Sequence, residues 1–235
     1  MFLISGASRG IGAELSRKLC QSGHRVIMLS RNRKRLDELA GGINKEGADP
    51  LAFPLVFDLN DLPELENELK DMIRSIASGL DGLVNNAGML INKAFGDTSI
   101  KEARHLFDTN LFAPASLIRA CMPFLMGSKL KHVVNVTSMG GFQGSAKFSG
   151  LSWYSASKAA LGNLSECLAE EYREQGIRVN ALALGSVQTE MLEEAFPGFR
   201  APLGPEEMAD FIAWFLVEGP KFFNGKILPV SVSTP

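Results

Sequence analysis

The chain has 235 residues, 46% of them hydrophobic and 21% charged, with a formal net charge of −2. This size and balance fit one larger globular domain, and the near-neutral charge gives no electrostatic basis for binding nucleic acid or an anionic membrane. Because no apolar run reaches the ~20 residues that cross a bilayer, we expect no membrane-spanning segment and no membrane partner.

Strand-like and helix-like segments alternate along the chain. Short apolar runs predict strands at residues 2–4, 26–29, 51–57, 80–84, 132–136, 179–184 and 226–230. Apolar residues at helical spacing predict helices at residues 11–22, 31–40, 62–76, 100–125, 151–175 and 206–217. Pro114 and Pro123 are expected to bend or divide the fourth of these helices. The alternation predicts an α/β fold, a parallel sheet covered by helices on both faces, in one domain of residues 1–235.

A glycine-rich turn follows the first predicted strand. Residues 5–12 read Ser-Gly-Ala-Ser-Arg-Gly-Ile-Gly and lead directly into the first predicted helix. Glycines let a backbone approach a pyrophosphate closely, and a helix N-terminus offers free N–H groups and a positive dipole end. The spacing G-x-x-x-G-x-G is not decisive alone, but its place between a strand and a helix favours a dinucleotide site.

Tyr154 and Lys158 lie four residues apart at the start of a predicted helix, so their side chains should share one face. A phenol titrates near ~10, and a neighbouring ammonium would lower that pKa by favouring the phenolate. Taken alone, the pair fits an ordinary helix with one amphipathic tyrosine and one solvated lysine equally well. Its interpretation as a proton-transfer pair depends on other residues at the carboxyl ends of the strands, where ligands bind in such sheets.

Those other residues are present, in order. They are Asp58-Leu59 after the third strand, Asn85-Asn86-Ala87-Gly88 after the fourth, Asn110 in a helix, Ser138 at the end of the fifth strand, and Gly185, Val187 and Thr189 after the sixth. Together with the glycine turn and the Y-x-x-x-K pair, they resemble the short-chain dehydrogenase/reductase family over residues 1 to about 190. The resemblance implies a doubly wound, Rossmann-type, three-layer fold whose seven-stranded parallel sheet has the order 3-2-1-4-5-6-7.

The resemblance also implies reversible hydride transfer between a nicotinamide cofactor and a carbonyl carbon. It implies that Tyr154 is the general acid and that Ser138 orients the carbonyl oxygen. Lys158 would lower the pKa of Tyr154 and hold the ribose hydroxyls of the cofactor. Asn110 would hold a water in a proton relay that ends at Lys158. Plainer interpretations are a turn-capping hydroxyl for Ser138 and an asparagine that satisfies backbone groups for Asn110. The implied cofactor-binding residues are Gly6, Ser8, Arg9, Gly10, Ile11, Gly12, Ser30, Arg31, Asp58, Leu59, Asn86, Ala87, Gly88, Tyr154, Lys158, Gly185, Val187 and Thr189.

The end of the second strand bears on the choice of cofactor. NAD-binding relatives usually carry an acid there, which bonds the ribose 2′-hydroxyl and repels a 2′-phosphate. This chain has Ser30 followed by Arg31, and Arg9 lies in the glycine turn. Because a guanidinium grips phosphate through paired, charge-assisted hydrogen bonds, we predict that NADPH is preferred over NADH. Residues 33–35, also basic, are expected to form a solvated helix face.

Three features depart from the family pattern. Tyr154 follows Ser138 by 16 residues, about three more than usual, so the intervening loop is expected to border the substrate. Leu184 stands where a proline usually precedes Gly185, which puts the rigidity of that loop in doubt. The glycine-rich ending of many relatives is absent, so a homodimer is as plausible as a homotetramer, built through the helices at 100–125 and 151–175.

Residues 189–205 are expected to form a lid. Its apolar side chains are Met191, Leu192, Phe196, Phe199 and Pro202. Such a lid favours a small, largely apolar ketone, aldehyde or 3-oxoacyl compound as the substrate. A different class of function is a catalytically idle NADP-binding protein that senses redox state or scaffolds a partner.

The three cysteines and three histidines are scattered. They form no metal-ligand spacing and no disulfide framework, so we expect no metal site and a reducing, cytoplasmic environment. The chain enters a strand-like run at its first residues, without the charged and apolar regions of a signal peptide.

Overall fold

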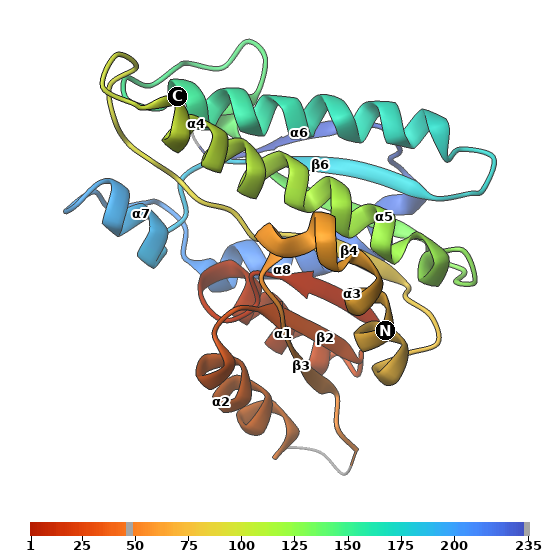
Figure 1. Cartoon of the computed structure of the whole chain (residues 1–235). Helices are drawn as coiled ribbons and strands as arrows, with labels where there is room; N and C mark the ends of the chain where they lie inside the picture. The colour runs from red at the N-terminus through yellow and green to blue at the C-terminus, as the bar shows by residue number, and fades with distance from the viewer. Residues whose placement is uncertain (46–48, 233–235) are drawn as a thin grey trace.

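A computed structural model describes residues 1–45 and 49–232, and the side chains of residues 62–65 and the tail at 233–235 lie outside the described part. Its centre is a parallel sheet of seven strands in the order β3-β2-β1-β4-β5-β6-β7 (Figure 1). The strands are β1 Phe2–Ser5, β2 Val26–Ser30, β3 Ala52–Val56, β4 Gly82–Asn85, β5 His132–Ser138, β6 Arg178–Leu184 and β7 Ile227–Val230. The predicted strand order is confirmed.

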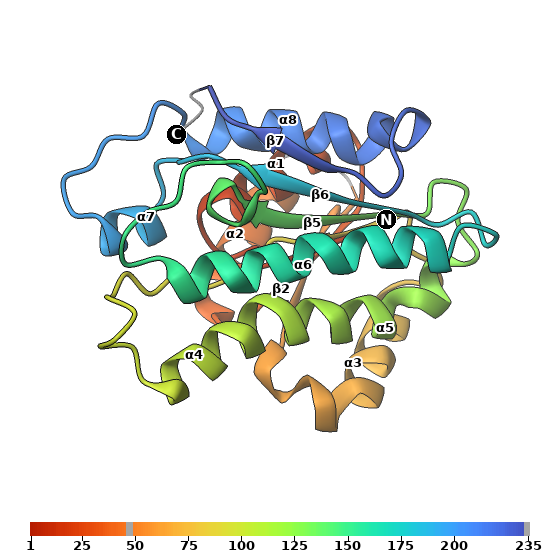
Figure 2. The same ribbon diagram turned by 90° about the horizontal axis from the view of Figure 1, so that it is seen from above.

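Helices cover both faces of the sheet, as Figure 2 shows from above. The helices are α1 Gly10–Gln21, α2 Arg33–Asn44, α3 Leu62–Ile76, α4 Ile100–Phe107, α5 Ala113–Leu125, α6 Ser152–Glu171, α7 Glu190–Ala195 and α8 Pro205–Glu218. On one face α1 packs against α8, and on the other α3 packs against α5 and α4 against α6. Short α7 lies outside both layers, beyond one end of the sheet (Figures 1 and 2).

The central strands are apolar on both faces because each face has its own core. In β2, Val26 and Met28 belong to the core under α1 and α8, whereas Ile27 and Leu29 belong to the core under α3 and α5. Successive strand side chains point to opposite faces, so a strand covered on both sides must be apolar throughout. Burial of each such side chain stabilises the fold by about 1.5–3 kcal/mol.

The predicted helix at 100–125 is divided just before its first proline. A π-helical turn, Asp108–Phe112, separates α4 from α5. Pro114 lies in the first turn of α5, where the π-helical turn runs directly into the α-helix and the proline has no N–H to donate, and Pro123 lies inside α5 near its end. The helix is thus divided beside Pro114, and α5 continues through Pro123.

Side-chain caps explain two other differences from expectation, the start of the second helix and a helix within the lid. The second helix begins at Arg33 rather than at residue 31, since the Asn32 side chain accepts a hydrogen bond from Arg35 N at 3.0 Å. The lid contains a helix, α7, whose N-cap Thr189 accepts from Leu192 N at 3.3 Å. Across the part of the chain that the structure describes, no helix has the length and hydropathy of a membrane span.

Candidate active site

A cavity of about 610 Å³ lies at the carboxyl ends of the strands. Its walls come from the glycine turn, the ends of β2 to β6 and the lid. Every residue predicted for the site lines it, except Gly12 and Asn110, which lie directly behind the wall. The volume is within the ~300–1,000 Å³ of small-molecule and cofactor sites.

The glycine turn is packed so closely that two of its positions require glycine. Gly6 has a φ of +67°, and a Cβ there would lie 2.9 Å from Ala87 Cα. A Cβ on Gly12 would lie 2.4 Å from the Gly6 carbonyl oxygen. The Asn86 side-chain nitrogen donates to the Ser5 carbonyl at 3.1 Å and to the Gly6 carbonyl at 3.3 Å, and so ties the end of β4 to the turn. The first N–H groups of α1 therefore face the cavity, as a pyrophosphate needs.

Two arginines line the cavity beside this turn. The Ser30 hydroxyl donates to the Ser8 hydroxyl at 2.8 Å, which joins the end of β2 to the glycine turn. Arg9 and Arg31, the next residues, both line the cavity. Each guanidinium has a carboxylate neighbour, because Arg31 Nη1 lies 3.4 Å from Asp58 and Arg9 forms ion pairs with the lid. A phosphate group could bind here by displacing these carboxylates or by sharing the guanidinium groups with them.

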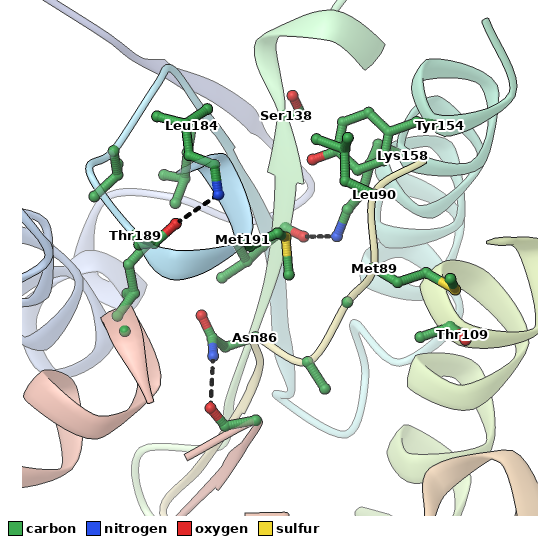
Figure 3. A pocket seen from close by; sticks show the side chains of 18 of the residues that line it. Asn86, Met89, Leu90, Thr109, Ser138, Tyr154, Lys158, Leu184, Thr189 and Met191 are labelled. Carbon is green, nitrogen blue, oxygen red and sulfur yellow. Dashed lines mark hydrogen bonds between the residues drawn. The ribbon is translucent and has the colours of Figure 1, made fainter. Parts of the chain in front are cut away.

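Tyr154 and Lys158 lie on one face of α6 and point toward the end of β5 (Figure 3). The Lys158 ammonium is 5% exposed and donates to the Val136 carbonyl at 2.9 Å. Burial lowers the pKa of Lys158 to about 8. It raises the pKa of Tyr154, against a smaller lowering by the hydrogen bond with Ser138. The net direction is thus opposite to the one expected for a phenol beside an ammonium, because burial of the phenol dominates.

Asn110 is fully buried in the π-helical turn, and its side chain bonds both to the main chain and to another side chain. Its side-chain oxygen accepts from Met89 N at 2.9 Å, and its nitrogen donates to the Met89 carbonyl and to Ser157 Oγ, both at 3.0 Å. A Cβ on Gly88 would lie 3.1 Å from both Asn110 Oδ1 and Lys158 Nζ. Asn110 therefore fixes the segment after β4 and stands beside Lys158.

Part of the cavity wall is apolar. It is formed by Met89, Leu90, Phe148, Leu151, Met191, Leu192, Phe196 and Phe199. Phe148 and Leu151 come from the long loop after Ser138, so this loop borders the cavity. Lys147 holds that loop together, since its ammonium donates to the carbonyls of Gly140 at 3.0 Å and Phe142 at 2.6 Å.

Several residues around the cavity belong to none of the sequence motifs described above. Asn92 bonds the lid through the Ala195 carbonyl at 3.0 Å, and Lys147 fixes the long loop. Glu190 and Glu194 of α7 pair with arginines across the cavity. Their partners lie far away in the chain, so only the spacing of two acids four residues apart could have singled them out.

The geometry agrees with comparisons to known proteins. The short chain dehydrogenase family model matches residues 1–198. A fatty acyl-CoA reductase of Acinetobacter baylyi is 30% identical over 222 residues, covering 93% of this chain and 73% of that protein. The ketoacyl reductase HetN of Nostoc sp. is 33% identical over 185 residues, covering 79% of this chain and 62% of that protein.

Solved structures extend the likeness to three dimensions. A short chain dehydrogenase from Shigella flexneri, complexed with NADP, superposes with a TM-score of 0.88 at 27% identity, over 97% of this chain and 95% of that one. The glycine turn, Ser138 and the Y-x-x-x-K pair all fall within the residues that the family model matches. The protein is thus an oxidoreductase of the short chain dehydrogenase family.

Proposed function

We propose that this protein is an NADPH-dependent reductase that transfers a hydride to the carbonyl of a small, largely apolar ketone, aldehyde or 3-oxoacyl compound. The observation that carries the proposal is one continuous cavity with two chemically different ends. One end has the glycine turn and two arginines, and the other has apolar walls. Ser138, Tyr154 and Lys158 lie between them, where cofactor and substrate would meet.

The proposed roles follow from the positions of these side chains. Bound NADPH would supply the hydride. Tyr154 would donate its phenolic proton to the carbonyl oxygen as negative charge develops there, and Ser138 would hydrogen-bond the same oxygen. With a pKa of about 8, Lys158 is mostly protonated at neutral pH and would bond the cofactor ribose. Asn110 would act beside it, in a proton relay through water.

Residues on the rim support the preference for NADPH. Ser30 replaces the acid that would repel a 2′-phosphate, and Arg9 and Arg31 supply two guanidinium groups. The NADP complex of the Shigella flexneri relative is consistent with this choice. The remaining cofactor contacts are proposed for the residues of the glycine turn, the ends of β3 and β4, and the segment at 185–189.

The substrate class is supported by the walls and by two relatives. The names of the Acinetobacter and Nostoc proteins describe reductases of acyl compounds. Phe148 from the long loop, together with Phe196 and Phe199 from the lid, would cover an aliphatic chain. Burial of such a chain contributes about 0.8 kcal/mol for each methylene group.

We also propose a cytoplasmic homodimer or homotetramer. All three cysteines are free thiols, which suits a reducing compartment. Large apolar side chains are exposed around α4 and α5, where Ile100 is 60% and Phe112 56% exposed. A second copy would cover them, and light scattering at micromolar concentration should give the mass of two or four subunits. A monomer mass would contradict the assembly.

The test of the activity is NADPH oxidation against a panel of ketones, aldehydes, quinones and 3-oxoacyl thioesters. We expect turnover of apolar carbonyl compounds, with the rate rising along an aliphatic series. NADPH binding without turnover on the whole panel would overturn the reductase and favour an idle sensor or scaffold protein.

A further inference from the structure

Two carboxylates of the lid lie against Arg9 of the glycine turn. Glu194 Oε1 lies 3.1 Å from Arg9 Nη1, and Glu190 Oε2 lies 3.7 Å from Arg9 Nε. Glu190 also lies 3.5 Å from Arg35 Nη1 on α2. These ion pairs hold α7, which follows β6 in the chain, against the glycine turn and α2 on the opposite wall of the cavity.

The pairing uses one face of α7. Glu190 and Glu194 are four residues apart, so their side chains share a face of the helix. Glu193 lies on another face, where its carboxylate accepts from Gly198 N at 3.0 Å and from the Gln188 side chain at 3.4 Å. Of the three acids in α7, only Glu190 and Glu194 therefore contact Arg9.

The same arginine belongs to the rim proposed for the 2′-phosphate. The 2.8 Å hydrogen bond between Ser8 and Ser30 brings Arg9 and Arg31 to one edge of the cavity. Arg31 is 3.4 Å from Asp58, so each guanidinium on the rim is paired with at least one carboxylate. A guanidinium has only five N–H donors. A phosphate that binds Arg9 must therefore displace the two carboxylates or share the guanidinium with them.

We propose that Glu190 and Glu194 compete with the 2′-phosphate of NADP(H) for Arg9, so that the lid sets how strongly NADP(H) is preferred over NAD(H). The proposal rests on the NADPH preference proposed above. A ligand without the 2′-phosphate leaves both ion pairs intact, whereas one that carries it gains Arg9 only by weakening them. Glu190 and Glu194 thus reduce the cofactor preference and release the lid when the phosphate binds.

Adenosine 2′,5′-bisphosphate and 5′-AMP test this directly, because they differ only in the 2′-phosphate and lack the nicotinamide. Calorimetric titration at low ionic strength, where surface charges are least screened, gives the ratio of their dissociation constants. In the Glu190→Gln/Glu194→Gln variant, this ratio should rise in favour of the bisphosphate by about threefold to tenfold. Glu193→Gln, which removes one carboxylate charge from the same helix without touching the Arg9 ion pairs, should leave the ratio as in the wild type.

A third variant identifies the shared group. Adding Arg9→Gln to the double variant should return the ratio to the wild-type value or below it. Tryptic cleavage after Arg200, an exposed lid residue, should become faster when the bisphosphate binds to the wild type, and 5′-AMP should have no such effect.

The outcomes separate this proposal from the cofactor preference. A wild-type protein that favours the bisphosphate, with a ratio unchanged in the double variant or raised equally by Glu193→Gln, overturns the competition and leaves the preference standing. The ratio of dissociation constants in the wild type could instead be near one and remain unchanged in Arg9→Gln and Arg31→Ala. That result overturns the preference and the competition together.

Discussion

The Lys158 ammonium lies 2.9 Å from the carbonyl oxygen of Val136, inside the fold. A buried ammonium is costly, and its pKa falls to about 8 because water is excluded around it. The carbonyl satisfies one of its three N–H donors and fixes the side chain toward the cavity. Lys158 is therefore charged at neutral pH but close to losing that charge.

A first prediction is that NADPH affinity falls as the pH rises through about 8. The protonated form of Lys158 would bond the ribose hydroxyls, and the neutral form loses the charge that strengthens those bonds. Fluorescence titration between pH 6.5 and 9.5 measures the effect. Lys158→Ala should bind NADPH more weakly at pH 7 and lose the dependence near pH 8. Equal affinities of wild type and variant at pH 7 would remove Lys158 from the ribose contact.

Tyr154→Phe should abolish nearly all turnover and keep cofactor binding, because only the phenolic hydroxyl is removed. Positioned general acids contribute about 10²–10⁴-fold to a rate. Tyr172→Phe is the matched control, since this tyrosine caps the far end of α6 and does not line the cavity. Steady-state kcat with NADPH is measured in all three proteins. A Tyr154→Phe enzyme with more than half the wild-type rate would exclude the proposed acid.

The glycine turn makes a prediction about packing. Gly12→Ala should destabilise the protein by about 1–3 kcal/mol and weaken NADPH binding, because its Cβ would lie 2.4 Å from the Gly6 carbonyl oxygen, and backbone must move. Gly42→Ala in α2 is the control, since a Cβ there meets nothing within 4 Å. That change should stabilise by about 0.4–1 kcal/mol. Urea unfolding measures both, and equal effects at the two glycines would contradict the packing argument.

The fold and the position of the site follow from local features of the sequence. Apolar runs predict the strands. The Gly6 turn and the Tyr154–Lys158 pair are each recognised from a few neighbouring residues. Features that depend on contacts distant in the chain do not follow. The pKa of Tyr154 depends on how tightly other elements enclose it, and the amide partners of Asn110 come from Met89, 21 residues away. The pairing of Glu194 with Arg9 spans 185 positions, so no pattern in either segment indicates it.

His132 provides a prediction of stability against pH. It is fully buried at the start of β5, bonded to the Leu216 carbonyl and to the Asn180 side chain, both at 3.0 Å. Burial lowers its pKa from 6.5 to about 4. The unfolded chain binds this proton more tightly, so the contribution is complete above pH 6.5 and is lost as the pH falls toward 4. The loss should reach about 2 kcal/mol by pH 5.

Urea unfolding of the wild type and His132→Gln at pH 7 and pH 5 isolates this contribution from that of the surface carboxylates, which are common to both proteins. The variant is expected to be the less stable protein at pH 7, because the glutamine cannot reproduce both hydrogen bonds. The difference between the two proteins should shrink at pH 5. A difference independent of pH would show that His132 does not titrate in this range.

The last prediction concerns the cofactor. Charge-assisted hydrogen bonds contribute about 1.5–3 kcal/mol each, and exposure and pairing with Asp58 place Arg31 at the lower end. NADPH should thus be favoured over NADH by roughly tenfold to a few hundredfold in kcat/KM, since ~1.4 kcal/mol is tenfold. Arg31→Ala should lower mainly the NADPH value, and Ser30→Asp should reverse the order by repelling the 2′-phosphate. Arg33→Ala, on the exposed face of α2, is the control and should keep the wild-type ratio. Equal use of both cofactors by the wild type would contradict the NADPH preference, and an unchanged ratio in Arg31→Ala would contradict the assignment of Arg31 to the 2′-phosphate.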